Sequence, residues 1–195
     1  LKLKNLFARQ LPAIFPNEKI KDFPFLSLIF YKNPEKKTRL ILEKAVKDKF
    51  LGANAIYTNF INEDIKYIKK AKDMGIYIVH EIYISPDSGL IMHEENQKFP
   101  NFSSNQEKLE DVERGIKLDK IKWNLSDKIL VPSQYCFDSA INMGADPKKI
   151  SLVHYGIKDE NFNLKTKPEP YKILFVGEVG LRKGSHYFAA AARIL

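Results

Sequence analysis

The chain has 195 residues, of which 44% are hydrophobic and 12% aromatic, so it can bury a core and is not a disordered polymer. Its 32 Lys and Arg residues outnumber 24 Asp and Glu residues, which gives a formal net charge of +8. That balance favours anionic partners such as nucleotide phosphates, nucleic acid or acidic lipid headgroups, although a solvated lysine-rich surface has the same composition. The single Cys136 excludes an internal disulfide and a multi-cysteine metal site, and it fits a reducing, cytoplasmic setting.

No apolar run approaches the ~18 residues of a membrane-spanning helix, and the first residues contain no signal-peptide pattern. The chain begins without Met and stops inside a helical pattern at Phe188–Leu195. We therefore expect it to be an internal piece of a longer protein.

The first half of the chain predicts alternating helices and strands. Residues 1–35 contain four prolines and one apolar run, Phe25–Tyr31, which fits either a short strand or the start of a helix. A strand–helix–strand unit of about 30 residues is typical of a parallel sheet. The predicted elements are a helix over Glu35–Leu51, a strand over Asn54–Thr58, a helix capped by Asn62 and ending at Met74, and a strand over Ile76–His80.

The second half continues the alternation, then adds a connector and a further strand. Ser133 is the expected N-cap of the third helix in this half. The predicted elements are helices over Leu90–Gln97, Gln106–Leu125 and Gln134–Met143, strands over Asp127–Val131 and Lys149–Val153, an extended connector over Asn161–Tyr171, and a strand over Lys172–Val176 followed by a helix. The predicted fold class is therefore α/β with a parallel sheet.

The segment from Gly177 to Gly184, GEVGLRKG, is the strongest candidate binding site. It is not a P-loop, and Gly177 and Gly180 are too far apart for a dinucleotide fingerprint. The segment is instead predicted to consist of a strand end, a glycine-bearing loop and the start of a helix, with Arg182 and Lys183 next to that helix start. Helix N-termini and cations favour phosphate, so the segment predicts an anion site. The alternative is an ordinary surface turn with exposed cations.

His80 ends a buried predicted strand and Glu81 follows it, on the side where parallel sheets bind ligands. A histidine there can hydrogen-bond a substrate hydroxyl or orient a carboxylate, and the alternative is a structurally satisfied histidine. His93-Glu94-Glu95 is not a zinc-protease motif because Gln97 replaces the second histidine, and no metal site is expected. No nucleophile motif and no nucleic-acid-binding pattern occurs, so no nucleic-acid partner is expected.

Two stretches, ILVPSQYCFDSAINMGADPKKISLVHYGI and YKILFVGEVGLRKGSHYFAAA, resemble the GT-B glycosyltransferases of the group-1, family 4 type. That family has V-P-S after a strand, a glycine after the next helix, a K-I strand, a Y-G-I turn and an I-L-F-V-G strand followed by K-G. The match covers residues 125–195 and, more weakly, extends back to residue 52. HEENQKFP also resembles a subgroup with an acidic helix at this place.

The resemblance implies two Rossmann-like domains facing across a cleft, with an acceptor on the first and a nucleotide-sugar donor on the second. Residues 1–153 would be the N-terminal acceptor-side domain, 154–171 the interdomain linker and 172–195 the first βα unit of the C-terminal domain. It also implies that Gly177, Arg182 and Lys183 bind the donor diphosphate and that His80 lies by the transferred sugar.

The implied reaction is hexosyl transfer with retention and without a metal or cofactor, to a sugar, polysaccharide or lipid-linked acceptor. A cytoplasmic protein is expected, with peripheral contact to the inner face of the membrane through its basic surface. Because the acidic E-x7-E motif of the family is not in the sequence, the piece is expected to lack a complete active site.

Two departures from the family pattern leave alternatives open. Glu178 follows the glycine where many relatives have Arg or Lys, and Lys158 replaces the usual Asp of the Y-G-I turn. The alternatives are a non-catalytic Rossmann-like binding domain, or another GT-B enzyme such as a sugar-nucleotide epimerase.

Overall fold

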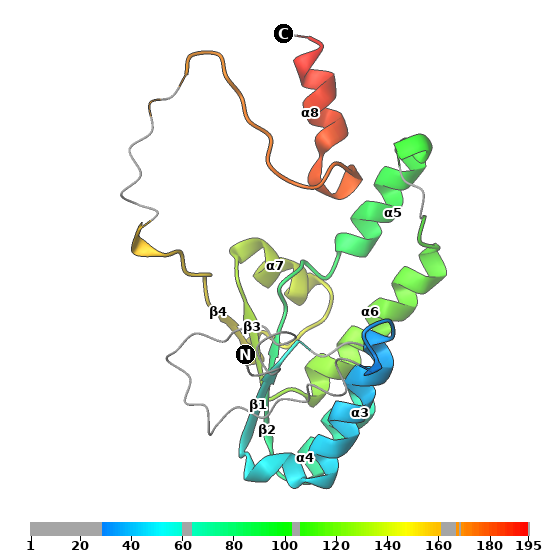
Figure 1. The fold of residues 1–195 in the computed structure, drawn as a ribbon, viewed down its shortest axis with the longest axis vertical. Helices are drawn as coiled ribbons and strands as arrows, with labels where there is room; N and C mark the ends of the chain where they lie inside the picture. Colours follow the sequence, from blue (N-terminus) through cyan, green and yellow to red (C-terminus); the bar gives the residue numbers. More distant parts are fainter. Residues whose placement is uncertain (1–28, 60–63, 103–105, 161–166, 168, 195) are drawn as a thin grey trace. The chain divides into compact units, whose positions relative to one another are not determined.

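The computed structural model describes residues 29–59, 64–102, 106–160, 167 and 169–194 (Figure 1). Most of the Phe25–Tyr31 run, the Asn62 cap and most of the predicted connector lie outside the described residues. The described residues form two compact units, one of residues 29–56 and 64–77 and the other of residues 57–59 and 78–194.

Four parallel strands form one sheet in the order β1-β2-β3-β4, which confirms the predicted α/β class. His80 of β2 is in register with Ile129 of β3, which in turn pairs with Ile150 of β4. A parallel pair needs a crossover, and every crossover here contains a helix. The strands are β1 (Ala55–Thr58), β2 (Tyr77–Glu81), β3 (Lys128–Val131) and β4 (Ile150–Leu152).

The first unit contains α3 (Pro34–Lys47) and α4 (Ile65–Asp73). The side chain of Asn33 accepts a hydrogen bond from the Lys36 amide at 2.9 Å, so it caps the start of α3. Tyr67, Ile68 and Ala71 are the buried residues of α4, and the Tyr67 hydroxyl lies 3.4 Å from the Glu43 carboxylate of α3.

The prediction that the first helix runs to Leu51 is wrong at its end. The helix stops at Lys47, and a short turn, η2 (Lys49–Gly52), follows with positive φ at Lys49 (49°), Phe50 (49°) and Leu51 (55°). Left-handed backbone is costly for residues with a Cβ, so the helical periodicity of the sequence alone does not forecast this turn.

An apolar core of the second unit includes residues of β3 and β4. Trp123, 3% exposed, lies in this core with Ile129 and Val131. Gly89 allows α5 and α6 to approach closely, because a Cβ at Gly89 would lie only 2.9 Å from Val112 Cγ1. The elements of this unit are α5 (Ser88–Lys98), η4 (Pro100–Phe102), α6 (Leu109–Leu125), α7 (Gln134–Asn142), η5 (Pro147–Lys149), η7 (Leu181–Lys183) and α8 (Ser185–Ala192), together with most of the sheet.

The cap predicted for the helix after β3 is confirmed. Ser133 Oγ accepts a hydrogen bond from the Cys136 amide at 3.2 Å, and α7 begins at the next residue, Gln134. This cap fixes the direction in which the chain leaves the carboxyl end of β3.

The strand predicted over Lys172–Val176 is not formed, whereas the helix after it is present as α8. Ile173, Leu174 and Val176 are 68%, 80% and 82% exposed. A strand exists only when another strand completes its hydrogen bonds, and none of the described residues pairs with this segment. An apolar sequence of the right length is therefore not sufficient to make a strand here.

Candidate functional site

The carboxyl ends of the four strands lie along one edge of the sheet, because all four strands run in the same direction. Tyr57 lies near the end of β1, Glu81 is the last residue of β2, and Tyr155 follows β4. This edge is where open α/β sheets bind ligands, and it holds the predicted pair His80-Glu81.

The carboxylate of Glu81 accepts hydrogen bonds from two tyrosines. The Tyr57 hydroxyl donates to Oε2 at 2.6 Å, and the Tyr155 hydroxyl donates to Oε1 at 2.9 Å. The two donors lie 24 and 74 residues from Glu81 in sequence. We call Tyr57, Glu81 and Tyr155 the Tyr–Glu–Tyr cluster.

Both phenols of the cluster stay protonated at neutral pH. The hydrogen bond to Glu81, with partial desolvation, raises the pKa of Tyr57 to about 12. Desolvation of the hydroxyl and then the hydrogen bond to Glu81 raise the pKa of Tyr155. Each phenolic O–H is therefore occupied as a donor to the carboxylate. The lone pairs of the phenolic and carboxylate oxygens remain to accept hydrogen bonds from a ligand.

His80 is buried, with 5% of its surface exposed. Burial lowers the pKa of its imidazole to about 4, and the Lys122 ammonium adds to this, whereas Asp119 and Glu81 oppose it. Lys122 is itself 5% exposed and lies 2.6 Å from an Asp119 oxygen. His80 is therefore a neutral imidazole at pH 7.

One ring nitrogen of His80 has no partner. Nδ1 is buried and forms no hydrogen bond within the part of the chain that the structure describes. His80 is therefore not a structural histidine whose two ring nitrogens both have hydrogen-bond partners. An unpaired buried polar group costs free energy and favours any ligand group that completes its hydrogen bond.

The predicted phosphate segment brings Gly177 and Lys183 together. A Cβ at Gly177 would lie 3.7 Å from Lys183 Cγ, an ordinary contact distance, so the lysine stem lies beside the glycine. Arg182 and Lys183 lie in η7 with exposed side chains, and neither forms an ion pair with any described carboxylate. Both cations are therefore open to an anion.

The backbone enters α8 through Gly184. Its φ of 69° is left-handed, a conformation that glycine adopts without the steric cost of a Cβ. Ser185 Oγ accepts from the Gly180 amide at 2.9 Å and lies 3.2 Å from the Gly180 carbonyl, to which it can donate. These contacts close the loop that carries Arg182 and Lys183.

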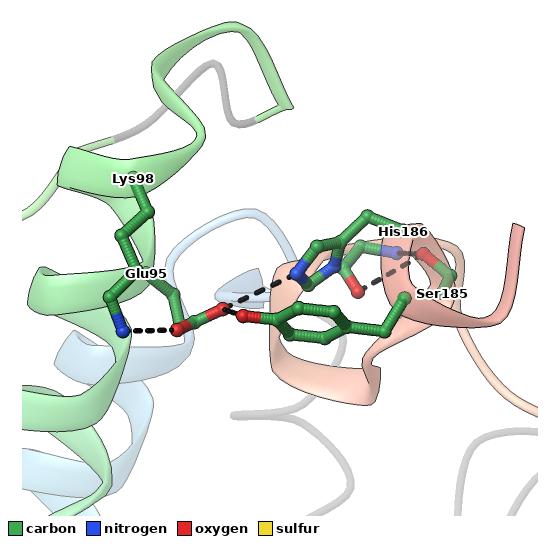
Figure 2. A network of polar contacts seen from close by, with 6 residues as sticks. Glu95, Lys98, Ser185 and His186 are labelled. Carbon is green, nitrogen blue, oxygen red and sulfur yellow. Dashed lines mark hydrogen bonds and ion pairs between the residues drawn. The ribbon is translucent and has the colours of Figure 1, made fainter. Parts of the chain in front are cut away.

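A network centred on Glu95 joins α8 to α5 (Figure 2). Lys98 and the Tyr187 hydroxyl donate to the Glu95 carboxylate at 3.0 and 2.9 Å, and His186 Nε2 lies 3.3 Å from it. The hydrogen bond from Lys98, then that from Tyr187, lowers the pKa of Glu95. The ring of His186 also packs against Phe99, with the ring centres 4.5 Å apart.

The predicted site residues fall into two groups. Arg182 and Lys183 lie in η7 with Gly177 beside Lys183, and His80 lies at the end of β2. No hydrogen bond, ion pair or ring contact joins His80 to that turn among the residues that the structure describes. Neither Tyr57 nor Tyr155 was predicted from the sequence as a partner of Glu81, and for Tyr57 one signal was present. Its position near the end of a neighbouring strand was the available signal.

Comparison of the sequence with models of known protein families found no match, and comparisons with curated proteins and with solved structures also found none. Within the described ranges, no helix is both long and apolar enough to cross a membrane. The same residues contain no group of three or more His, Cys, Asp or Glu side chains arranged to hold a metal ion.

Proposed function

We propose that the chain is the acceptor-side part, with the start of the donor side, of a retaining GT-B glycosyltransferase that uses a nucleotide-sugar donor. The observation that carries the proposal is the position of His80 and Glu81 at the carboxyl end of an inner strand of a parallel sheet. Further support is the ordered series of family-like segments from Val131 to Gly184.

In this proposal Arg182 and Lys183 neutralise the donor diphosphate. A nucleoside diphosphate gains negative charge as it leaves, and cations already in place stabilise that charge in the transition state. The exposed, unpaired state of both side chains in η7 supports this role. The role proposed for Gly177, which lies beside the Lys183 stem, is to let the donor approach the backbone.

The role proposed for His80 is to hold a hydroxyl of the transferred sugar. Its pKa of about 4 makes it neutral at pH 7, so it acts as a hydrogen-bond partner and not as a cationic acid. Its unpaired Nδ1 supports this role.

The proposed acceptor is a sugar, a polysaccharide or a lipid-linked glycan, handled in the cytoplasm. The net charge of +8 suits a peripheral approach to the anionic inner face of a membrane. Flotation with vesicles containing anionic lipid tests this contact. We expect binding that 0.5 M salt reverses, and no flotation in low salt would contradict it.

The transfer test uses the product of the complete coding sequence, because the proposal assigns half of the donor site to a second domain. The protein is incubated with UDP-, GDP- and ADP-linked hexoses and a mixture of oligosaccharides, and release of nucleoside diphosphate is followed. Lys183→Ala should reduce transfer by about 100-fold or more. Lys172→Ala, which removes an exposed lysine paired with Glu169, is the matched control and should leave it unchanged.

The same assay separates the alternatives. An epimerase yields a new nucleotide-sugar without releasing diphosphate, which proton NMR of the anomeric signals detects. A non-catalytic binding domain consumes none of the donors, and the acidic, exposed Glu178 within the loop favours this alternative. Either result, or full activity in Lys183→Ala, would overturn the proposal.

A further inference from the structure

The Tyr–Glu–Tyr cluster is an exposed polar site with a defined hydrogen-bonding character. The side chains of Tyr57 and Tyr155 are 61% and 64% exposed, although both hydroxyls are fixed on Glu81. Tyr83, 52% exposed, lies near enough to Tyr155 to contribute to the raised pKa of its phenol. The edge of the sheet therefore presents a carboxylate among aromatic rings.

The polar atoms of the cluster can only accept hydrogen bonds. Each phenol donates its single O–H in a hydrogen bond to the carboxylate, whereas a carboxylate has about four acceptor sites and only two are used. A ligand for this site must therefore bring several donors close together. Adjacent hydroxyls of a sugar ring and an ammonium group are the two common ligand groups that do so.

The charge of the chain favours the neutral ligand. A net charge of +8 repels a cation as it approaches, whereas a neutral polyol meets no such barrier. The exposed tyrosine rings add flat apolar surface, which suits the C–H face of a sugar ring.

We propose that the Tyr–Glu–Tyr cluster binds adjacent hydroxyls of a neutral sugar ring, with Glu81 as the principal hydrogen-bond acceptor. In the glycosyltransferase proposed above, on which this assignment rests, the sugar is the terminal residue of the acceptor. Tyr57 and Tyr155 orient the carboxylate and provide ring surface, and Glu81 is a binding residue.

The test measures sugar binding without any nucleotide-sugar. The whole chain is titrated with methyl glycosides of glucose, galactose and mannose, followed by saturation-transfer NMR, with methylammonium, which carries three N–H donors, as a separate probe. We expect millimolar binding of at least one glycoside. Glu81→Gln should weaken it by about tenfold or more, because it removes a charged acceptor. Tyr77→Ala, at the opposite end of β2, is the control and should leave it unchanged.

Three results would overturn the proposal: no glycoside binds, only methylammonium binds, or Glu81→Gln binds as well as wild type. If Glu81→Gln does not fold, Tyr155→Ala replaces it, because its exposed side chain can be removed without opening the core. That variant should weaken binding at least threefold, and unchanged binding would equally overturn the proposal. Because no donor is present, failed transfer and failed sugar binding are distinguishable results.

Discussion

The pKa of His80 predicts a specific loss of stability in acid. In the folded protein the pKa is about 4, compared with 6.5 for an unperturbed histidine. The unfolded chain therefore binds more protons between these two values, and the free energy of unfolding falls as the pH is lowered through this window. Well above pH 6.5, for example at pH 7.5, the imidazole is neutral in both states and the contribution is fully present.

The size of the effect follows from the two pKa values. Each pH unit of separation corresponds to about 1.4 kcal/mol, so the contribution of His80 approaches about 3 kcal/mol below pH 4. At pH 5, part of the way through the window, the loss relative to pH 7.5 is about 2 kcal/mol. Burial and the nearby Lys122 ammonium are the physical causes, because both disfavour a positive charge on the imidazole.

The assay compares wild type with His80→Gln in urea at pH 7.5 and pH 5.0. Trp123 is the single tryptophan and lies in the core of the same unit, so its fluorescence reports unfolding there. Wild type should lose about 2 kcal/mol more than His80→Gln on acidification. His154→Gln, at an exposed position, should lose as much as wild type.

Equal losses in wild type and His80→Gln would refute the reasoning. Comparing the two proteins in their loss of stability between pH 7.5 and pH 5.0 removes the contributions of all other titrating groups, because both proteins share them. Such a result would mean that the imidazole takes up its proton in the folded state as readily as in the unfolded chain.

Two further predictions concern the elements that carry the candidate site. Ser133→Ala should lower the free energy of unfolding by about 1 kcal/mol in the same urea assay, because the Cys136 amide loses its capping oxygen. Glu95→Gln should speed hydrogen exchange in α8, because the contacts of Glu95 with His186 and Tyr187 hold that helix on α5.

Matched variants check both predictions. Ser133→Thr keeps an oxygen at the cap and should retain most of the stability, so an equal loss in both variants would mean that the cap is not the cause. Glu94→Gln removes a neighbouring, exposed carboxylate of α5 and should leave exchange in α8 unchanged. Unaltered exchange in Glu95→Gln would show that the network does not hold α8 in place.

Several features of the fold could be predicted because they depend on residues close together in sequence. The periodicity around Val112 and Trp123, the cap at Ser133 and the short apolar run of β2 each report local structure. The alternation of strands and helices then required a parallel sheet, because the short helical crossovers return the chain to the same end. The position of His80 and Glu81 at a carboxyl strand end followed from this.

The sequence by itself determined the order of the elements, the parallel sheet and the position of His80-Glu81, because each depends on local periodicity and chain direction. Only the tertiary structure decided that Tyr57 and Tyr155 meet on Glu81, since they come from distant parts of the chain. It also decided the burial of His80 beside Lys122 and the absence of a strand at Lys172–Val176. Burial, pKa and strand pairing are properties of neighbours in space, and a linear sequence does not list those neighbours.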